Sequence, residues 1–168
     1  MTIEAAEVVA KKSQQDMAHL DGDLIEYITV FVGEQLFGIP VTVVQDVFEV
    51  QRMTAVPMSV PEVRGVLNLR GRIVTAIDMR VRLGLPVPED DTSRMAVGSE
   101  ENGEAVGLRV DSVGEVLSLP ASDVERSPTN LHPRWQQVAC GVHRLEKDLM
   151  VVLDVTKALE LQNAATAA

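Results

Sequence analysis

The stretch that decides the fold is Gly65-Val66-Leu67-Asn68-Leu69-Arg70-Gly71-Arg72-Ile73-Val74-Thr75-Ala76-Ile77-Asp78. Without gaps, it aligns with a second stretch 76 residues further along the chain, Gly141-Val142-His143-Arg144-Leu145-Glu146-Lys147-Asp148-Leu149-Met150-Val151-Val152-Leu153-Asp154. Both copies predict a strand, a tight polar turn and a more apolar strand that ends in aspartate. The repeat indicates two copies of one structural unit.

A second pair of segments supports the same repeat. Residues 38–47 align with residues 107–116 at an offset of 69, and the glycines, an acidic residue and four apolar positions coincide. Each half therefore predicts one small β unit of about five strands, which is barely large enough to bury a core alone. Short strands with frequent turns, and no long helical period between them, favour two packed β-barrels over an α/β fold.

The composition restricts the possible partners. Hydrophobic residues make up 46% of the 168 residues, but aromatic residues only 3%, so valine and other aliphatic side chains must build the core. The formal net charge is −10. A surface of this sign is repelled by nucleic-acid phosphates and by anionic lipid headgroups. We therefore expect neither nucleic acid nor a membrane surface as a direct partner.

The chain ends and the cysteine content favour a cytoplasmic protein. Residues 1–23 are polar and weakly patterned, which predicts a flexible N-terminal extension, and they lack the apolar core of a signal peptide. No run of roughly 20 apolar residues could span a bilayer, so no membrane insertion is expected. The single cysteine, Cys140, cannot form an internal disulfide. The folded body is expected over residues 24–161, with a frayed tail at 162–168.

The predicted helices are short and few. Residues 155–161 predict a C-terminal helix with Asp154 as its N-cap, and Asp78 precedes a helical turn that Gly84 ends. Residues 86–93 predict an acidic linker between the halves. Two strand-terminal aspartates could also form the carboxylate pair of a hydrolase. Capping explains both residues without catalysis, and neither is followed by the Thr-Gly or Ser-Gly of aspartic proteases, so a structural role is favoured.

No other constellation predicts catalysis or a cofactor. The three histidines lack partners at metal-ligand spacing, and Cys140 with His143 would supply only two ligands. Neither a nucleophile elbow nor a phosphate-binding glycine loop is present. The sequence therefore predicts no enzyme, no metal site and no cofactor.

The two copies of the repeat differ at their turns, where Leu69-Arg70-Gly71-Arg72 contrasts with Leu145-Glu146-Lys147-Asp148. Gly71 suits a tight hairpin because glycine tolerates positive φ, whereas such a turn should accept almost any polar residue in place of Arg70. On this acidic chain, a cationic cluster comprises Arg64, Arg70, Arg72, Arg80 and Arg82. The cluster could pair with the chain's own carboxylates or meet a partner surface, where arginine is favoured. The comparison leaves Arg70, and with it Asn68, for function.

Three ordered blocks of the sequence resemble signatures of CheW domains. Residues 65–80 resemble GVxNLRG…(I/V)(I/V)…(I/V)D(L/M)R, residues 37–47 resemble (Y/F)G(I/L)…VxE(I/V), and residues 106–117 resemble VG(I/L)xVDxV…VL. The resemblance covers residues 24–161. It implies an all-β fold of two intertwined five-stranded SH3-like β-barrels, with short helices and a C-terminal helix.

The resemblance also implies a function. CheW proteins are non-enzymatic scaffolds that couple transmembrane, methyl-accepting chemotaxis receptors to the histidine kinase CheA, whose regulatory domain has the same fold. The chain would then be cytoplasmic and recruited to membrane receptor arrays through these partners. An adaptor of the same fold in another signalling array, such as surface motility or development, is the alternative.

Family members bind receptors through an apolar groove between the barrels. By position, the resemblance assigns receptor binding to Val44, Asp46, Gly65, Asn68, Arg70, Gly107 and Val116. Asp46 stands where glutamate is usual, which keeps the charge and shortens the reach. The valines could equally be core, and the glycines could serve close backbone approach. Contact with the kinase and ring formation are assigned to Val124, Pro128 and Leu131, beside Asn130 where an aromatic residue is common.

Overall fold

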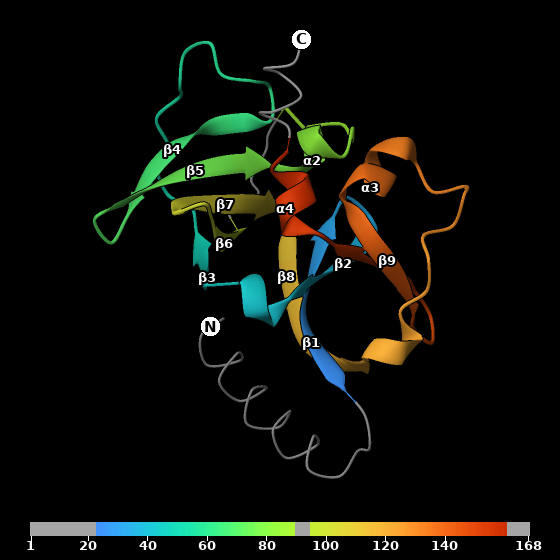
Figure 1. The fold of residues 1–168 in the computed structure, drawn as a ribbon. Coiled ribbons are helices and arrows are strands. Elements are labelled where there is room, and N and C mark those ends of the chain that lie inside the picture. The colour runs from blue at the N-terminus through green and yellow to red at the C-terminus, as the bar shows by residue number, and fades with distance from the viewer. Residues whose placement is uncertain (1–22, 90–94, 161–168) are drawn as a thin grey trace.

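The computed structural model describes residues 23–89 and 95–160, which form an all-β fold (Figure 1). The strands are β1 (Leu24–Val32), β2 (Gln35–Pro40), β3 (Asp46–Glu49), β4 (Val63–Leu69), β5 (Arg72–Asp78), β6 (Met95–Glu101), β7 (Glu104–Val110), β8 (Ser112–Pro120), β9 (Ala139–Arg144) and β10 (Leu149–Leu153). The short helices are α2 (Met79–Arg82), α3 (Pro133–Val138) and α4 (Val155–Ala158), with 3₁₀ turns η1 (Val41–Val43) and η2 (Ala121–Asp123). Apart from Asp23, the expected extension at 1–23 lies outside the described residues, as do the tail at 162–168 and the second half of the linker.

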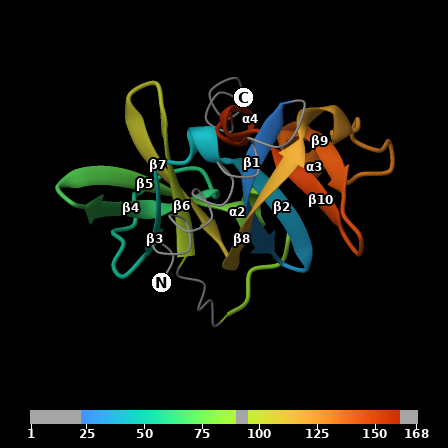
Figure 2. The ribbon, with the colours of Figure 1, turned by 90° about the horizontal axis from the view of Figure 1, so that it is seen from below.

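Each of the two sheets combines strands from both sequence halves. Sheet A has the order β8-β1-β2-β10-β9, and sheet B has the order β3-β6-β7-β5-β4. Sheet A thus takes two strands from the first half and three from the second, and sheet B does the reverse. Figure 2 shows the sheets side by side, with sheet B on the left and sheet A on the right. The intertwined arrangement implied by the resemblance is confirmed, and neither half forms a sheet from its own strands alone.

The two sheets share one hydrogen-bonding register, so the sequence repeat is also a structural repeat. Thr29 of β1 lies opposite Gly38 of β2, and Gly98 of β6 lies opposite Gly107 of β7, with both members shifted by the same 69 residues. The β4–β5 and β9–β10 hairpins likewise match with the 76-residue shift. Both offsets seen in the sequence therefore recur in the strand ladders.

Three apolar clusters form the core. The largest contains residues from both sheets, among them Ile39 of β2 and Leu108 of β7. Each smaller cluster belongs to one sheet, and seven members of one correspond by the repeat to seven members of the other. In sheet B these are Phe48, Val50, Leu69, Val74, Ala76, Ala96 and Ala105, and in sheet A, in the same order, they are Leu117, Leu119, Leu145, Met150, Val152, Tyr27 and Leu36. Sheet A carries the larger side chain at most of these positions.

Each sheet curls so that its edges approach, but its ladder stays open. In sheet B the edge strands are β3 and β4. An isolated bridge between Thr54 and Val66 links the segment after β3 to β4, and Glu125 and Val142 form the corresponding bridge in sheet A. The all-β, five-stranded prediction is confirmed, with open sheets in place of the closed barrels that were expected.

Both predicted aspartate caps are present. Oδ1 of Asp78 accepts hydrogen bonds from the Arg80 amide (2.9 Å) and the Val81 amide (3.4 Å) at the start of α2. Oδ1 of Asp154 accepts one from the Lys157 amide (3.2 Å) at the start of α4. These bonds satisfy amides that have no partner within a helix. The carboxylates are thus explained by capping, and helix α4 ends earlier than the expected 155–161.

Helix α3 has no counterpart among the predicted elements. It begins at Pro133, and Nδ1 of the preceding His132 accepts a hydrogen bond from the Arg134 amide (3.2 Å). Proline at the first helical position is a recognised start signal. The helix is too short to show a periodic apolar pattern, which is why the sequence did not predict it.

The imidazole of His143 is enclosed in sheet A. His143 is only 2% exposed and packs edge-on against Tyr27, with ring centroids 5.7 Å apart. Among the described residues, its Nε2 has no hydrogen-bond partner. Burial lowers the pKa of the His143 imidazole below its ordinary value, although Asp123 and Glu125 act in the opposite direction. The repeat places Leu67 at the corresponding position of sheet B, so an apolar side chain fits this environment.

We expect His143 to make folding weaker in mild acid. The unfolded chain protonates this residue near pH 6.5 while the folded chain resists protonation, so stability present above that pH is lost as the pH falls below it. His143→Leu should remove this loss, and its stability relative to the natural chain should rise by up to about 1.4 kcal/mol per pH unit. Urea unfolding at pH 7.5 and 5.5 measures the difference. An unchanged difference at the two pH values would contradict the buried, neutral state of His143.

Candidate functional site

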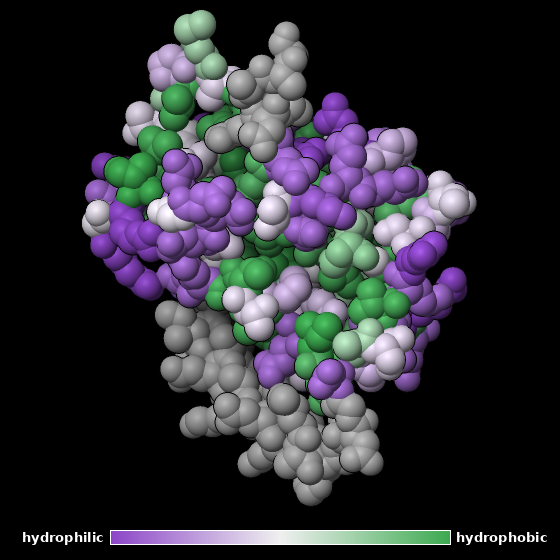
Figure 3. Space-filling model, in the orientation of Figure 1, coloured by the Kyte–Doolittle hydropathy of each residue, from purple (hydrophilic) through white to green (hydrophobic). Residues whose placement is uncertain are grey.

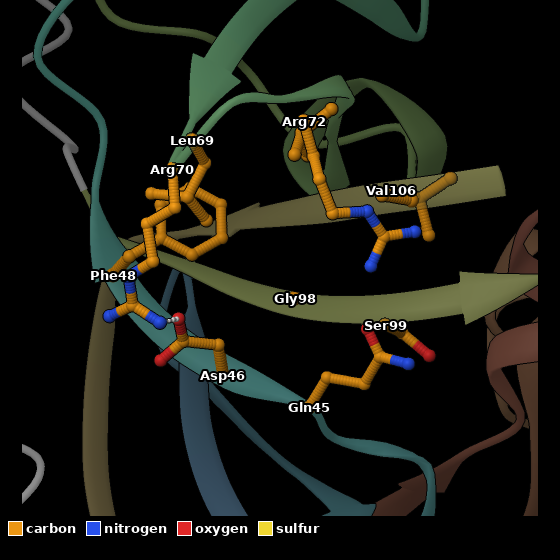
Figure 4. Close-up of a pocket in the computed structure, with 11 residues that line it drawn as sticks. Gln45, Asp46, Phe48, Leu69, Arg70, Arg72, Gly98, Ser99 and Val106 are labelled. Atoms are coloured by element: carbon orange, nitrogen blue, oxygen red, sulfur yellow. Dashed lines mark ion pairs between the residues drawn. The ribbon is translucent and has the colours of Figure 1, made fainter.

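An ion pair between Arg70 and Asp46 is the centre of the candidate site. Nη1 of Arg70, in the β4–β5 turn, lies 2.9 Å from Oδ2 of Asp46, the first residue of β3 (Figure 4). Strands β3 and β4 are the opposite edges of sheet B, so the ion pair lies where the two edges of the curled sheet approach each other. The Arg70 side chain is 70% exposed and that of Asp46 21%. A pair this exposed contributes at most about 1 kcal/mol, so folding does not depend on it.

The backbone at Arg70 adopts a conformation that arginine rarely takes. Its φ is 52° and that of Gly71 is 84°, as in a two-residue type I′ hairpin turn. The β6–β7 turn has the same geometry, with φ 53° at Asn102 and 80° at Gly103. Asn-Gly is the favoured pair for such a turn. The expectation that the turn accepts almost any polar residue at position 70 is therefore wrong.

Asn68 has a structural task in the same turn. Its Oδ1 accepts a hydrogen bond from the Gly71 amide (2.9 Å), which fixes the chain reversal. The turn thus explains Asn68 and Gly71. It does not explain Arg70, because asparagine or glycine would serve the backbone better.

A pocket of about 200 Å³ opens beside the ion pair (Figure 4). Its apolar lining comes from Phe48, Leu69, Val74 and Ala105, which belong to the small cluster of sheet B. Gly107 lies behind this lining, since a Cβ there would come within 3.0 Å of Cζ of Phe48. Gly107 therefore makes room for a pocket wall.

Polar side chains surround the same pocket. Arg72 lies 3.4 Å from Glu100, and Nε2 of Gln45 donates a hydrogen bond to the same carboxylate (3.0 Å). The hydrogen bond from Gln45, and to a smaller extent the one from Arg72, lowers the pKa of the Glu100 carboxyl. Together with Arg70 and Asp46, these groups give an apolar pocket with a charged and amide-bearing rim, which suits binding of a protein surface.

Val44 and Val116 are not among the residues that line the pocket. Both are half-buried and pack against the large cluster shared by the two sheets. Val116 lies opposite Ile28 in the β8–β1 ladder, and Val44 directly follows η1. Figure 3 shows apolar side chains exposed across the middle and lower part of the molecule, below a band of hydrophilic side chains. The two valines are thus partly core residues, as the sequence left open, while Asp46 and Arg70 line the pocket and Gly107 lies behind one of its walls.

Gly65 has a steric explanation. A Cβ at this position would lie 2.5 Å from the carbonyl oxygen of Thr54, on the returning segment that bridges β4. The corresponding Gly141 is held in the same way, since its Cβ would lie 2.7 Å from the carbonyl oxygen of Glu125. Gly65 therefore permits close backbone approach, and its assigned part in receptor binding remains a prediction.

We expect Gly65→Ala to destabilise the fold by about 1–3 kcal/mol, because the added methyl group must push apart two backbones that are hydrogen-bonded to each other. Urea denaturation of the purified variant measures this change. Any loss of partner binding in the variant should then follow the loss of folded protein. Unchanged stability combined with weakened binding would instead place Gly65 in the binding surface.

The residues assigned to kinase contact lie on the segment between β8 and β9. Val124 is half-buried over Gly141. The Leu131 amide donates a hydrogen bond to the Pro128 carbonyl (3.1 Å), and Leu131 packs against the large cluster. In Figures 1 and 2 this segment and the β4–β5 hairpin lie at opposite ends of the molecule. The hairpin that carries Arg70 and the segment assigned to kinase contact therefore lie on separate surfaces.

A second ion pair, between Arg80 and Asp111, was not predicted from the sequence, although both residues lie in blocks that resemble CheW signatures. Nε and Nη2 of Arg80 lie 2.8 and 2.5 Å from the two carboxylate oxygens of Asp111, and each side chain is 20% exposed. Oδ2 of Asp111 also accepts a hydrogen bond from the Gly33 amide (2.7 Å). This arrangement ties the end of β5 to the β1–β2 turn, and thus sheet B to sheet A.

The other arginines of the predicted cluster also find partners within the chain. Arg64 lies 3.5 Å from Asp78. Arg82 donates hydrogen bonds to the carbonyls of Ala158 (3.0 Å) and Lys157 (3.3 Å) at the end of α4. Burial lowers the pKa of this guanidinium. Of the two readings of the cluster, pairing with the chain's own acceptors describes these side chains, and Arg70 is the member most open to a partner.

In residues 23–89 and 95–160, no group of three or more His, Cys, Asp or Glu side chains could hold a metal ion. In the same ranges, no helix has the length and apolar character needed to cross a bilayer.

The intertwined sheets and the exposed, polar-rimmed pocket define an all-β binding module. The sequence matches the CheW-like domain over residues 26–163, and the chain therefore belongs to the CheW-like family. The chemotaxis protein CheW of Klebsiella aerogenes is 26% identical over 140 residues, covering 83% of this chain and 84% of that protein. The chemotaxis protein CheW of Bacillus subtilis is 29% identical over 141 residues, covering 83% and 90%.

A solved structure has the same fold. The scaffolding protein TtCheW of Thermoanaerobacter tengcongensis superposes with a TM-score of 0.70 at 22% identity, covering 78% of this chain and 89% of that chain. These comparisons confirm the predicted family and the all-β class. Family membership makes the chain a chemotaxis coupling adaptor and not an enzyme. The hydrolase alternative is thereby dropped, in agreement with the capping roles of Asp78 and Asp154.

Proposed function

We propose that this chain couples transmembrane chemoreceptors to the regulatory domain of the histidine kinase CheA. It acts in the cytoplasm as one CheW-like domain over residues 24–161, and it reaches the membrane array through these two partners. It performs no chemistry, and its effect is to place the kinase where a change in receptor conformation shifts the population of active kinase.

One observation carries this proposal. Arg70 is highly exposed, occupies a backbone conformation that favours asparagine or glycine, and contributes little to folding through its pair with Asp46. Such a residue is best explained by an external contact. The assigned receptor residues at the pocket and the assigned kinase residues between β8 and β9 lie on separate surfaces, so one chain has room for both partners at once.

Binding measurements test the proposal. The purified chain should bind a receptor cytoplasmic fragment and the purified kinase regulatory domain separately, and it should also form a ternary complex. Leu131→Glu should weaken kinase binding and leave receptor binding within about twofold, provided that its thermal unfolding matches that of the natural chain. Failure to bind either partner would refute the coupling function. Competition between the partners would refute the two-surface arrangement.

A further inference from the structure

The pocket beside Arg70 marks a difference between two sheets that otherwise share one register. At the corresponding place of sheet A, Leu36 and Met150 are buried within the small cluster. In sheet B the same repeat positions hold Ala105 and Val74, which line the pocket. The chain thus fills this place in sheet A with its own large side chains and leaves it open in sheet B.

The glycines behind these positions show the same contrast. A Cβ on Gly38 would lie 2.6 Å from Sδ of Met150, so the methionine lies directly across that glycine. A Cβ on Gly107 would meet only the tip of Phe48 at 3.0 Å, and Cγ1 of Val74 would be 3.5 Å away. Sheet B has the shorter side chains Val74 and Ala105 where sheet A has Met150 and Leu36. Sheet B therefore lacks the atoms that close the equivalent space in sheet A. Phe48 forms a wall of the pocket but does not fill it.

The size and lining of the pocket restrict its occupant. At about 200 Å³ it is smaller than the roughly 300–1,000 Å³ typical of sites for drug-sized ligands. Between the polar side chains of its rim, the lining is aliphatic and aromatic, so an apolar side chain matches that part of the pocket. The exposed guanidinium of Arg70 has five N–H donors, and its ion pair with Asp46 does not use all of them. It can therefore also bind a carboxylate or carbonyl group next to the inserted apolar side chain.

We propose that the pocket receives one apolar side chain of the chemoreceptor, which takes the place that Leu36 and Met150 fill in sheet A. The Arg70–Asp46 pair forms the polar rim around the inserted side chain. This inference rests on the proposed function, because it identifies the receptor as the partner from the residues assigned to that role at the pocket. It adds an apolar subsite to a receptor surface assigned to the groove between the sheets.

Filling the pocket from within tests the inference. Ala105→Leu installs the side chain that sheet A carries at the equivalent position, and Ala55→Leu adds the same atoms at an exposed position outside the pocket. Ala105→Leu should unfold at the same or a higher temperature than the natural chain, bind the receptor cytoplasmic fragment at least tenfold more weakly, and bind the kinase regulatory domain within twofold. Ala55→Leu should bind the receptor fragment within twofold.

The possible outcomes separate this inference from the proposed function. If the natural chain does not bind the receptor fragment, the proposed function itself is refuted. Receptor binding within twofold by a well-folded Ala105→Leu variant would overturn only the subsite. If Ala105→Leu unfolds early, Val74→Met, which copies Met150 of sheet A, replaces it under the same criteria. Equal loss of receptor and kinase binding in a stable variant would also overturn the inference, because the pocket would then not be specific to the receptor.

Discussion

Arg70→Glu is expected to abolish receptor-dependent control of the kinase while the protein stays folded. The substitution reverses the charge of the most exposed arginine of the site and places a carboxylate next to Asp46. Because the existing pair is exposed, its loss and the new repulsion should cost no more than about 1 kcal/mol of unfolding free energy. Receptor binding should fall by tenfold or more, which is the range of a central interface arginine.

Arg70→Asn separates the side chain from the turn. Asparagine suits positive φ and already occupies the matching position at 102, so this variant should be as stable as the natural chain or slightly more stable. It removes the guanidinium without adding a negative charge. Receptor-dependent kinase activity and urea unfolding should be measured for both variants. Normal kinase control by a folded Arg70→Asn variant would show that the turn, and not the arginine, is what the partner requires.

Arg80→Ala is expected to cause the largest loss of stability, about 2–4 kcal/mol. Removing Arg80 takes two charge-assisted hydrogen bonds from the largely buried carboxylate of Asp111. Asp111 also holds the Gly33 amide, so its disturbance should loosen the β1–β2 turn as well. The midpoint of urea denaturation should therefore shift strongly, with little change in its slope.

An exposed ion pair and a double variant serve as controls for Arg80→Ala. Arg144 forms a pair with Glu125 at 2.8 Å, but the side chains are 74% and 46% exposed, so Arg144→Ala should cost less than about 1 kcal/mol. The repeat places Thr156 and Thr42 at the positions equivalent to Arg80 and Asp111. The double variant Arg80→Thr with Asp111→Thr copies that half and should cost less than the sum of the two single changes. Equal effects of Arg80→Ala and Arg144→Ala would contradict a structural role for the Arg80–Asp111 pair.

The fold could be predicted to the level of its repeat. The alignment of residues 65–78 with 141–154 anticipated both terminal hairpins, and the strand-terminal Asp78 and Asp154 anticipated both helix caps. The exchange of strands between the halves did not follow from the residues, because a repeat shows which segments are equivalent but not which copies pair. The resemblance to CheW domains supplied that step. The open ladders depend on contacts between strands that are distant in sequence, and helix α3 is too short to leave a periodic pattern.

The site was less predictable than the fold. The resemblance to CheW domains selected Asp46, Arg70 and Gly107. No pattern in the residues indicated that β3 and the β4–β5 turn meet, because β3 and β4 are opposite edges of one sheet. The positive φ of Arg70 was missed because Asn-Gly, and not Arg-Gly, is the usual signal of such a turn. The pocket itself depends on the difference between Ala105 and Leu36, which becomes meaningful only when the two sheets are superposed through the repeat.

The central claim is that this chain acts as a coupler by binding alone, and a reconstituted kinase assay tests it most directly. Receptor-containing membranes and purified CheA would be assayed for kinase autophosphorylation with and without the chain, in the presence and absence of the receptor's stimulus. We predict that kinase activity rises several-fold and becomes sensitive to the stimulus only when the chain is added. Kinase activity that is unchanged and insensitive to the stimulus, in samples where all three proteins are shown to be bound together, would contradict the account.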